Sequence, residues 1–196
     1  MQTITVPWSA SADDRATIAE WQREQGAVVR SAYAQAHDAD GRPRSEQALR
    51  DLLKRRFPDH PLGSWAIHCA TREGMRLRTQ RPDGRIVFGG RGNLERLHKG
   101  LIDRAEWRRI RHSRPIEIVG DRTKWGNRHM RLSPDGLTAM VTFLKRPVML
   151  RLPRMAGKTG HLMRALAELT ERCEIGMQFS LGAKTLSLTF DPTNLR

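Results

Sequence analysis

The sequence of 196 residues is poor in cysteine and has no long apolar run, and each deficit excludes classes of protein. Its two cysteines, Cys69 and Cys173, lie 104 positions apart with no Cys-x-x-Cys pair, which excludes a disulfide scaffold, a zinc ribbon and a thioredoxin-type motif. We expect both to be small buried apolar residues. No stretch approaches the ~20 apolar residues of a bilayer-spanning helix, and the first residues show no secretory leader. We therefore expect a cytoplasmic protein that does not span a membrane.

Acidic residues are scarce relative to basic ones. Lysine and arginine number 35 against 21 aspartates and glutamates, a formal net charge of +14. Such an excess of positive charge causes repulsion within the folded chain, which a negatively charged partner would relieve. Nucleic acid is therefore the first expectation for a partner, and an acidic membrane surface is the alternative. Residues 1–71 carry 9 charges of each sign, residues 72–131 carry 17 basic and 7 acidic, and residues 132–196 carry 9 and 5. The middle segment is rich in arginine, whose planar fork binds phosphate and stacks on bases, which favours nucleic acid.

Helix signals dominate residues 9–112. Ser11 and Ser45 are predicted N-caps of two amphipathic helices. A short third helix is expected around Trp65, and Asp103 is predicted to begin a fourth through a capping box. We therefore expect this part of the chain to be mostly helical.

From residue 113 onward the pattern changes to that of short strands. Ser-Pro-Asp-Gly at residues 133–136 predicts a hairpin, and one helix is predicted from Thr159. Five or six strands with one helix predict a small barrel, which a further strand at residues 3–6 completes. The fold class is therefore α+β, with a barrel of residues 1–8 and 113–196 that the helical residues 9–112 interrupt. The predicted strands after residue 112 are 116–118, 129–132, 137–143, 148–152, 175–181 and 186–190.

Signals for catalysis, metals and cofactors are weak. Ala-Gly-Lys-Thr at residues 156–159 lies between a predicted strand and a predicted helix, where a phosphate-binding P-loop is found. Leu152 stands where that motif requires glycine, and Pro153 removes an amide donor, so a degenerate P-loop NTPase is a minor alternative. The seven histidines show no metal-ligand spacing, and no nucleophile and base form a recognisable pattern. We expect no catalytic residue, no metal and no cofactor.

The densest signal is a run of glycine and arginine between residues 88 and 128. The glycines permit close approach of the backbone to a ligand, and arginines three and four residues apart make one face of the helix predicted at 103–112 cationic. Together these residues suit contact with a phosphate backbone. Trp125 lies in a basic turn beside glycine, where it either stacks on an end base pair or unpaired base or anchors the loop in the core.

The order of the motifs in this region adds a family resemblance. Phe-Gly-Gly at residues 88–90 precedes a helix, a strand hairpin and a terminal hairpin. This order resembles the N-terminal half of type V CRISPR effectors and their transposon-encoded TnpB relatives, over residues 85–190. In that family an N-terminal strand joins an oligonucleotide-binding-type β-barrel, the wedge domain, which a helical recognition lobe interrupts. The other motifs that carry the resemblance are Arg-Pro at 114–115, Gly-Asp at 120–121, Gly-Asn-Arg at 126–128 and Leu-Pro at 152–153.

The resemblance implies partners and site residues. In the family the barrel grips the scaffold of a guide RNA, and the wedge and helical lobe hold the guide–target heteroduplex and read a short motif in the target DNA. Family members continue into a RuvC-like nuclease and a zinc ribbon, whereas this chain ends at Arg196, so we expect no cleavage by this chain alone and a separate nuclease subunit as the source of any cleavage. The predicted nucleic-acid contacts are Arg91, Lys99, Arg108, Arg111, Arg114, Lys124, Asn127 and Arg128, with Trp125 as the stacking residue.

Two other functions stay open from the sequence. The first is a stand-alone DNA-binding regulator or transposition accessory protein that needs no RNA. The second is the degenerate P-loop NTPase, in which Lys158 would bind the nucleotide. Guide RNA and target DNA are the expected partners, and no membrane is expected.

Overall fold

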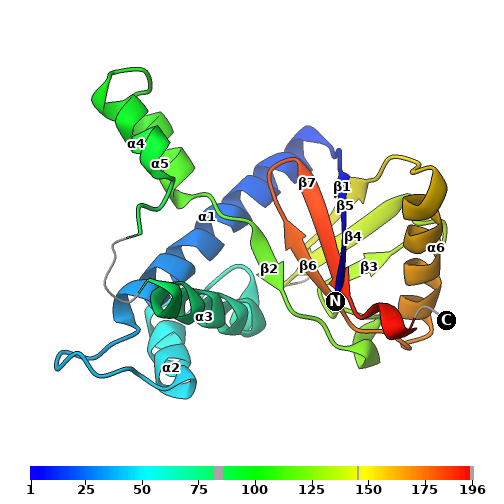
Figure 1. The fold of residues 1–196 in the computed structure, drawn as a ribbon, viewed down its shortest axis with the longest axis horizontal. Helices are drawn as coiled ribbons and strands as arrows, with labels where there is room; N and C mark the ends of the chain where they lie inside the picture. The colour runs from blue at the N-terminus through cyan, green and yellow to red at the C-terminus, as the bar shows by residue number, and fades with distance from the viewer. Residues whose placement is uncertain (82–85, 145, 195–196) are drawn as a thin grey trace. The chain divides into compact units, whose positions relative to one another are not determined.

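The structure, a computed structural model, describes residues 1–81, 86–144 and 146–194 of the chain. The chain divides into two compact units (Figure 1). We call residues 1–18 with 115–196 the strand unit and residues 19–114 the helical unit. The division expected from the sequence, at residues 8 and 112, differs from this one because helix α1 (Ala12–Gln35) runs from the strand unit into the helical unit.

Polar N-caps begin the first two helices where the sequence predicts them. The Ser11 hydroxyl accepts a hydrogen bond from the Asp14 amide (3.1 Å), and the Ser45 hydroxyl accepts one from the Ala48 amide (3.2 Å), so both predicted helix starts are confirmed. The third helix is not short, since it has 18 residues. The sequence pattern predicts no helix at residues 91–98, where the structure has one, so the helix predicted to begin at Asp103 is the fifth. The helices after α1 are α2 (Glu46–Arg56), α3 (Gly63–Gln80), α4 (Arg91–His98) and α5 (Arg104–His112).

Helices α1, α2 and α3 enclose the core of the helical unit. Val28 of α1, Leu49 of α2 and Ile67 of α3 are buried in one apolar cluster. A Cβ atom added to Gly74 of α3 would lie 2.3 Å from the Cβ of Ala32 in α1. This close approach of two helices therefore requires glycine at position 74, and it fixes α3 firmly against α1.

Within the described residues, seven strands form two antiparallel sheets in the strand unit. One sheet has the order β1-β7-β6-β2, and the other has the order β3-β4-β5. The N-terminal strand pairs with the last strand from Gln2 opposite Phe190 to Pro7 opposite Thr185, so the helical unit is inserted after the first strand. The strands are β1 (Gln2–Pro7), β2 (Ile116–Ile118), β3 (Met130–Leu132), β4 (Thr138–Phe143), β5 (Arg146–Arg151), β6 (Met177–Leu181) and β7 (Thr185–Phe190).

The prediction of a closed barrel is wrong, whereas the α+β class is confirmed. The two sheets are linked at an isolated bridge, where Ser9 and Arg151 exchange two backbone hydrogen bonds of 2.9 and 2.8 Å. Strands β2 and β3 have only three residues each, and a 3₁₀ turn and loop separate them. Over the part of the chain that the structure describes, β2 and β3 therefore stay the outer strands of separate sheets, and closure would require them to pair.

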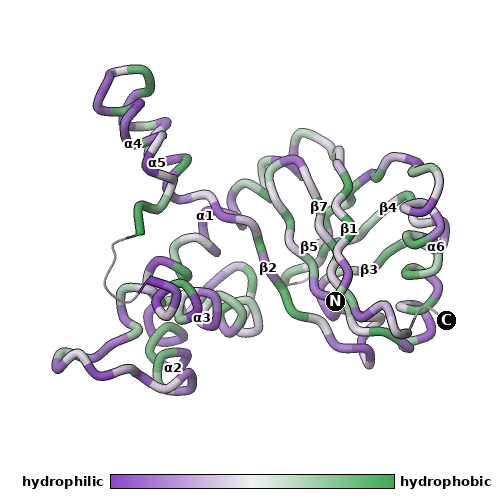
Figure 2. The backbone as a smooth tube through the Cα atoms, in the orientation of Figure 1, coloured by the Kyte–Doolittle hydropathy of each residue, from purple (hydrophilic) through white to green (hydrophobic). Residues whose placement is uncertain are grey.

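Alternating burial along the strands forms the core of the strand unit. Leu186, Leu188 and Phe190 of β7 are fully buried, as expected for every second residue of a strand with one face inside. Helix α6 (Gly157–Glu171) follows β5 and buries Leu166. The strands accordingly include many of the hydrophobic segments in Figure 2.

Two expectations from composition concern cysteine and membranes. Cys69 is buried as predicted, but Cys173 is only half-buried. It lies two residues after the end of helix α6, in a left-handed conformation with φ 59°. Among the described residues, none of the helices combines the length and the apolar character that crossing a bilayer demands.

Candidate nucleic-acid interface

Helices α4 and α5 form a hairpin, which we call the arginine hairpin (residues 91–114; Figure 1). Glycine shapes both ends of α4, since Gly90 before it has φ 85° and Gly100 after it has φ 69°, conformations that other residues adopt at a cost. The Asp103 carboxylate begins α5 by accepting a hydrogen bond from the Glu106 amide (2.6 Å), so this predicted cap is confirmed. These two glycines therefore shape the hairpin backbone.

The arginine hairpin carries many more basic than acidic side chains. Its 24 residues contain 8 lysines and arginines against 3 acidic residues. Four of the predicted nucleic-acid contacts, Arg91, Lys99, Arg108 and Arg111, are exposed on it. These four side chains therefore belong to one solvent-accessible cationic element.

The fifth predicted contact in this unit, Arg114, is instead used inside the protein. Its guanidinium donates a hydrogen bond to the Glu73 carboxylate (2.9 Å), which also accepts two from Arg76 (2.7 and 2.8 Å). The Arg114 side chain is 24% exposed and lies 5.9 Å from the centroid of the Phe88 ring. Arg114 therefore joins α3 to the end of the arginine hairpin, and its contact with nucleic acid stays a prediction.

Arg30 of α1 is a basic residue that sequence reasoning missed. It donates hydrogen bonds to the carbonyl oxygens of Arg111 (3.2 Å) and His112 (3.3 Å) at the C-terminus of α5, a favourable place for a cation. Burial, followed by the nearby charges of Arg111 and Arg114, lowers the pKa of Arg30. Burial and then Arg30 likewise lower the pKa of His112. Positive charges are thus crowded at this end of the hairpin, and an anion would relieve their repulsion.

A groove of about 600 Å³ opens beside Arg30 in the helical unit. Its lining combines guanidinium groups with aromatic rings, which suits phosphates and bases respectively. Two of the rings, Tyr33 and Phe88, meet edge to face with centroids 5.6 Å apart. No local motif could reveal this groove, because its lining comes from segments far apart in the sequence. The charged and aromatic residues that line it are Arg30, Arg56, Arg111, Tyr33, Phe57 and Phe88.

The other predicted contacts lie in the strand unit, on the segment of residues 119–129 that we call the Trp125 loop. The Asp121 carboxylate accepts hydrogen bonds from the Thr123 hydroxyl and from Arg128 (3.0 Å). The Thr123 hydroxyl, and after it Arg128, lower the pKa of Asp121. Arg128 is therefore already paired with a carboxylate, whereas Lys124 is exposed in the 3₁₀ turn of residues 122–124.

Asn127 is buried, and its predicted contact with nucleic acid is wrong. Its side-chain amide donates hydrogen bonds to the carbonyl oxygens of Ile118 (3.2 Å) and Met177 (2.9 Å), and its oxygen accepts one from the His129 amide (3.0 Å). Only 2% of the residue is exposed. Asn127 therefore satisfies three backbone groups that lie far from water, and it holds the Trp125 loop against β2 and β6.

Trp125 is the exposed tip of this loop. It is 46% exposed, so the alternative that it anchors the loop in the core is wrong. Its backbone has φ 51° and ψ 40°, a left-handed conformation that is unusual for a bulky residue. The Arg131 guanidinium lies 5.0 Å from the centroid of the indole ring. The loop therefore presents a large aromatic side chain to solvent beside a cation.

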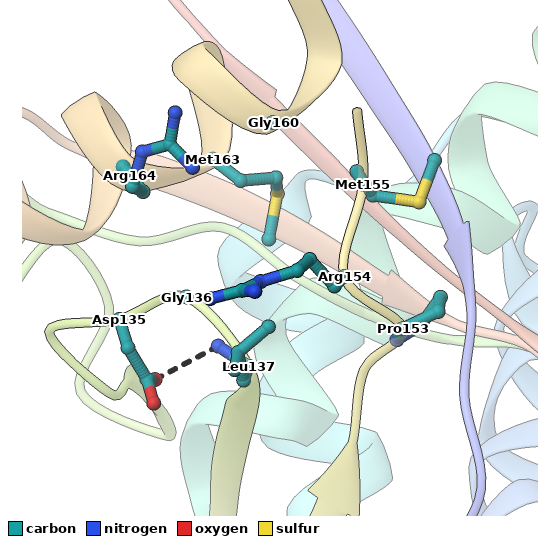
Figure 3. Close-up of a pocket in the computed structure, with 9 residues that line it drawn as sticks. All are labelled: Asp135, Gly136, Leu137, Pro153, Arg154, Met155, Gly160, Met163 and Arg164. Atoms are coloured by element: carbon teal, nitrogen blue, oxygen red, sulfur yellow. Dashed lines mark hydrogen bonds between the residues drawn. The ribbon is translucent and has the colours of Figure 1, made fainter. Parts of the chain in front are cut away.

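The pocket beside the start of α6 is too small for a nucleotide. Its volume is about 120 Å³, below the ~300 Å³ of the smaller ligand pockets. Arg154 extends between Gly136 and Met163, and the Asp135 carboxylate accepts a hydrogen bond from the Leu137 amide (2.9 Å; Figure 3). The strands on either side of α6 in the chain belong to antiparallel sheets, whereas P-loops are found in parallel ones. This geometry gives the P-loop alternative no support.

No protein-family model matches the chain, and a search of curated proteins found no match. Among the described residues, no group of three or more histidine, cysteine or acidic side chains could hold a metal ion. The described residues offer two basic surfaces to a ligand, namely the arginine hairpin with its groove in the helical unit and the Trp125 loop in the strand unit.

Proposed function

We propose that this chain binds nucleic acid, and that it does so as the non-catalytic half of an RNA-guided effector of the type V or TnpB-like kind. Its partners are a guide RNA and a target DNA duplex. The observation that carries the proposal is the arginine hairpin, on which Arg91, Lys99, Arg108 and Arg111 are all exposed. A separate nuclease subunit is the proposed source of any cleavage.

The charge of the arginine hairpin supports a polyanionic ligand. Eight of its 24 residues are basic and repel one another, whereas three are acidic. Arginine fits phosphate better than lysine does, since its planar fork donates two hydrogen bonds at once. The phosphates of a nucleic acid would therefore stabilise the hairpin more than small counterions do, and binding would release those counterions.

The chain topology supports the RNA-guided form of the proposal. The helical unit is inserted after β1, and β1 pairs with β7 near the end of the chain. This is the arrangement that the resemblance to wedge and recognition lobe implies. Arginine and aromatic side chains also share the groove beside Arg30, which suits a strand whose bases are partly accessible.

The test is to purify the full chain without nuclease and to identify the nucleic acid that accompanies it. We expect a discrete RNA, and we expect target DNA binding to be lost after RNase treatment. Specific DNA binding that survives RNase treatment would instead favour a DNA-binding regulator. Nucleotide binding that Lys158→Ala abolishes would favour the P-loop alternative.

A further inference from the structure

We infer that the outer face of the β3-β4-β5 sheet stacks unpaired bases of RNA. The inference rests on the proposed function and deepens it by naming the form of RNA that this face takes. Arg131 of β3 lies opposite Met140 of β4, and Met140 lies opposite Met149 of β5. Residues opposite one another in neighbouring strands point to the same face of the sheet, so these three side chains form a line across it.

This line is exposed and continues into the Trp125 loop. Met140 is 38% exposed and Met149 is 45% exposed, although their strand neighbours Val141 and Leu150 are fully buried. At the other end Arg131 lies over the indole ring of Trp125. We call Trp125, Arg131, Met140 and Met149 the stacking row. It places an indole, a planar cation and two thioethers side by side on the strand unit.

The chemistry of the stacking row fits the faces of nucleobases. Thioether sulfur and guanidinium groups both make favourable contacts with aromatic rings, and an exposed tryptophan is the usual stacking partner of unpaired bases. A hollow of about 270 Å³ beside the row is lined by Thr138 and Pro134 as well as by the two methionines. Bases splayed out from a single strand present flat apolar faces that this surface accommodates.

Charge favours nucleic acid over a protein as the occupant. Arg151 is exposed two residues after Met149 and so shares its face of the sheet, and Arg131 stands within the row. The acidic residue that lines the hollow is Glu171, whose carboxylate lies 3.9 Å from Arg131. Arg131 beside Met140 and Arg151 near Met149 match a strand that carries phosphates along its length.

The backbone of the Trp125 loop holds the indole in place. Trp125 adopts a left-handed conformation that costs roughly 1–2 kcal/mol for residues other than glycine. The next residue, Gly126, accepts a hydrogen bond from the Met177 amide (2.7 Å), and a Cβ on it would lie 2.5 Å from Thr170. The loop is thus anchored directly behind the exposed ring, and strain of this kind is common where a side chain is positioned for a ligand.

The test uses the full chain and a single-stranded RNA of mixed sequence that contains 5-iodouridine or 2-aminopurine. Ultraviolet crosslinks mapped by mass spectrometry are expected at Trp125, Met140 or Met149. The variants Trp125→Ala and Met140→Ser with Met149→Ser should each weaken binding of this RNA about tenfold and abolish the 2-aminopurine quench. The control is Leu144→Ser, which removes an apolar side chain that is 65% exposed outside the row and should change neither signal.

Each outcome decides the inference. Circular dichroism confirms that the variants fold, and the crosslinks on the unmodified chain need no variant. Binding of the RNA with crosslinks confined to the arginine hairpin would overturn the stacking row and leave the proposed function intact. Absence of any RNA binding would overturn both. Concentration-dependent self-association that the methionine variants abolish, without a change in RNA binding, would show that the row is instead a protein contact and would overturn the inference.

Discussion

Replacing Asn127 with alanine is expected to destabilise the strand unit strongly. The substitution removes three hydrogen bonds, of 3.2, 2.9 and 3.0 Å, and leaves two carbonyl oxygens and one amide without that partner in a buried place. A hydrogen bond contributes about 0.5–1.5 kcal/mol, and more when its buried partner is left unsatisfied, so the loss should reach about 3–5 kcal/mol. This is a large share of the ~5–15 kcal/mol that holds a typical domain folded.

Urea unfolding followed by circular dichroism measures this loss. The matched control is Arg128→Ala, the neighbouring position, whose exposed ion pair with Asp121 should contribute at most about 1 kcal/mol. A second variant, Asn127→Asp, keeps the shape of the side chain but replaces the donor amide with a carboxylate that faces two carbonyl oxygens. This variant should be less stable at neutral pH, where the carboxylate is charged, than at acid pH. An unfolding free energy for Asn127→Ala within about 1 kcal/mol of the unmodified chain would refute the reasoning.

Three further predictions concern single sites. Gly120→Ala should cost about 1–3 kcal/mol in urea unfolding, because its Cβ would lie 2.2 Å from the carbonyl oxygens of Gly126 and Met177, and an unchanged midpoint would contradict this. Glu73→Ala should cost about 2–4 kcal/mol, since it leaves two arginines without their carboxylate. Burial lowers the pKa of His129, so the unfolded chain protonates first and stability should fall as the pH drops below about 6.5; His129→Gln should flatten this loss, and an unaltered pH profile would oppose it.

Elements with strong local signals could be predicted from the sequence. Ser11 and Ser45 accept hydrogen bonds from amides three residues ahead, so each helix start is decided by neighbouring residues. The turn at residues 133–136 is likewise local, because the Gly136 amide bonds to the Ser133 carbonyl (2.9 Å) and joins β3 to β4. Helix α4 was missed because glycines at 89, 90 and 92 are typical of a loop.

The parts of the site that depend on distant contacts could not be predicted. Asn127 has a basic neighbour and looks accessible in the sequence, but one of its partners, Met177, is 50 residues away. Arg30 meets the end of α5 across 81 residues. Whether a sheet closes into a barrel also depends on pairing between strands that lie far apart in the sequence. Strands of three residues, such as β2 and β3, are too short for their sequence pattern to show which strand they pair with. By contrast, the exposure of the arginines on α4 and α5 could be predicted from their charge, because unpaired cations stay at the surface, where water solvates them.

The most direct test of the central claim measures the affinity of the full chain for structured RNA as a function of salt concentration. We compare the unmodified chain with Arg108→Glu/Arg111→Glu on the hairpin and with Arg23→Glu/Arg55→Glu, which reverses two exposed charges elsewhere in the helical unit. Two lost phosphate contacts should reduce the slope of log affinity against log salt by about 1.4–1.8 for the hairpin variant and leave the control slope nearly unchanged. Equal slopes for the two variants, or no binding of RNA or DNA by the unmodified chain in dilute buffer, would contradict the account.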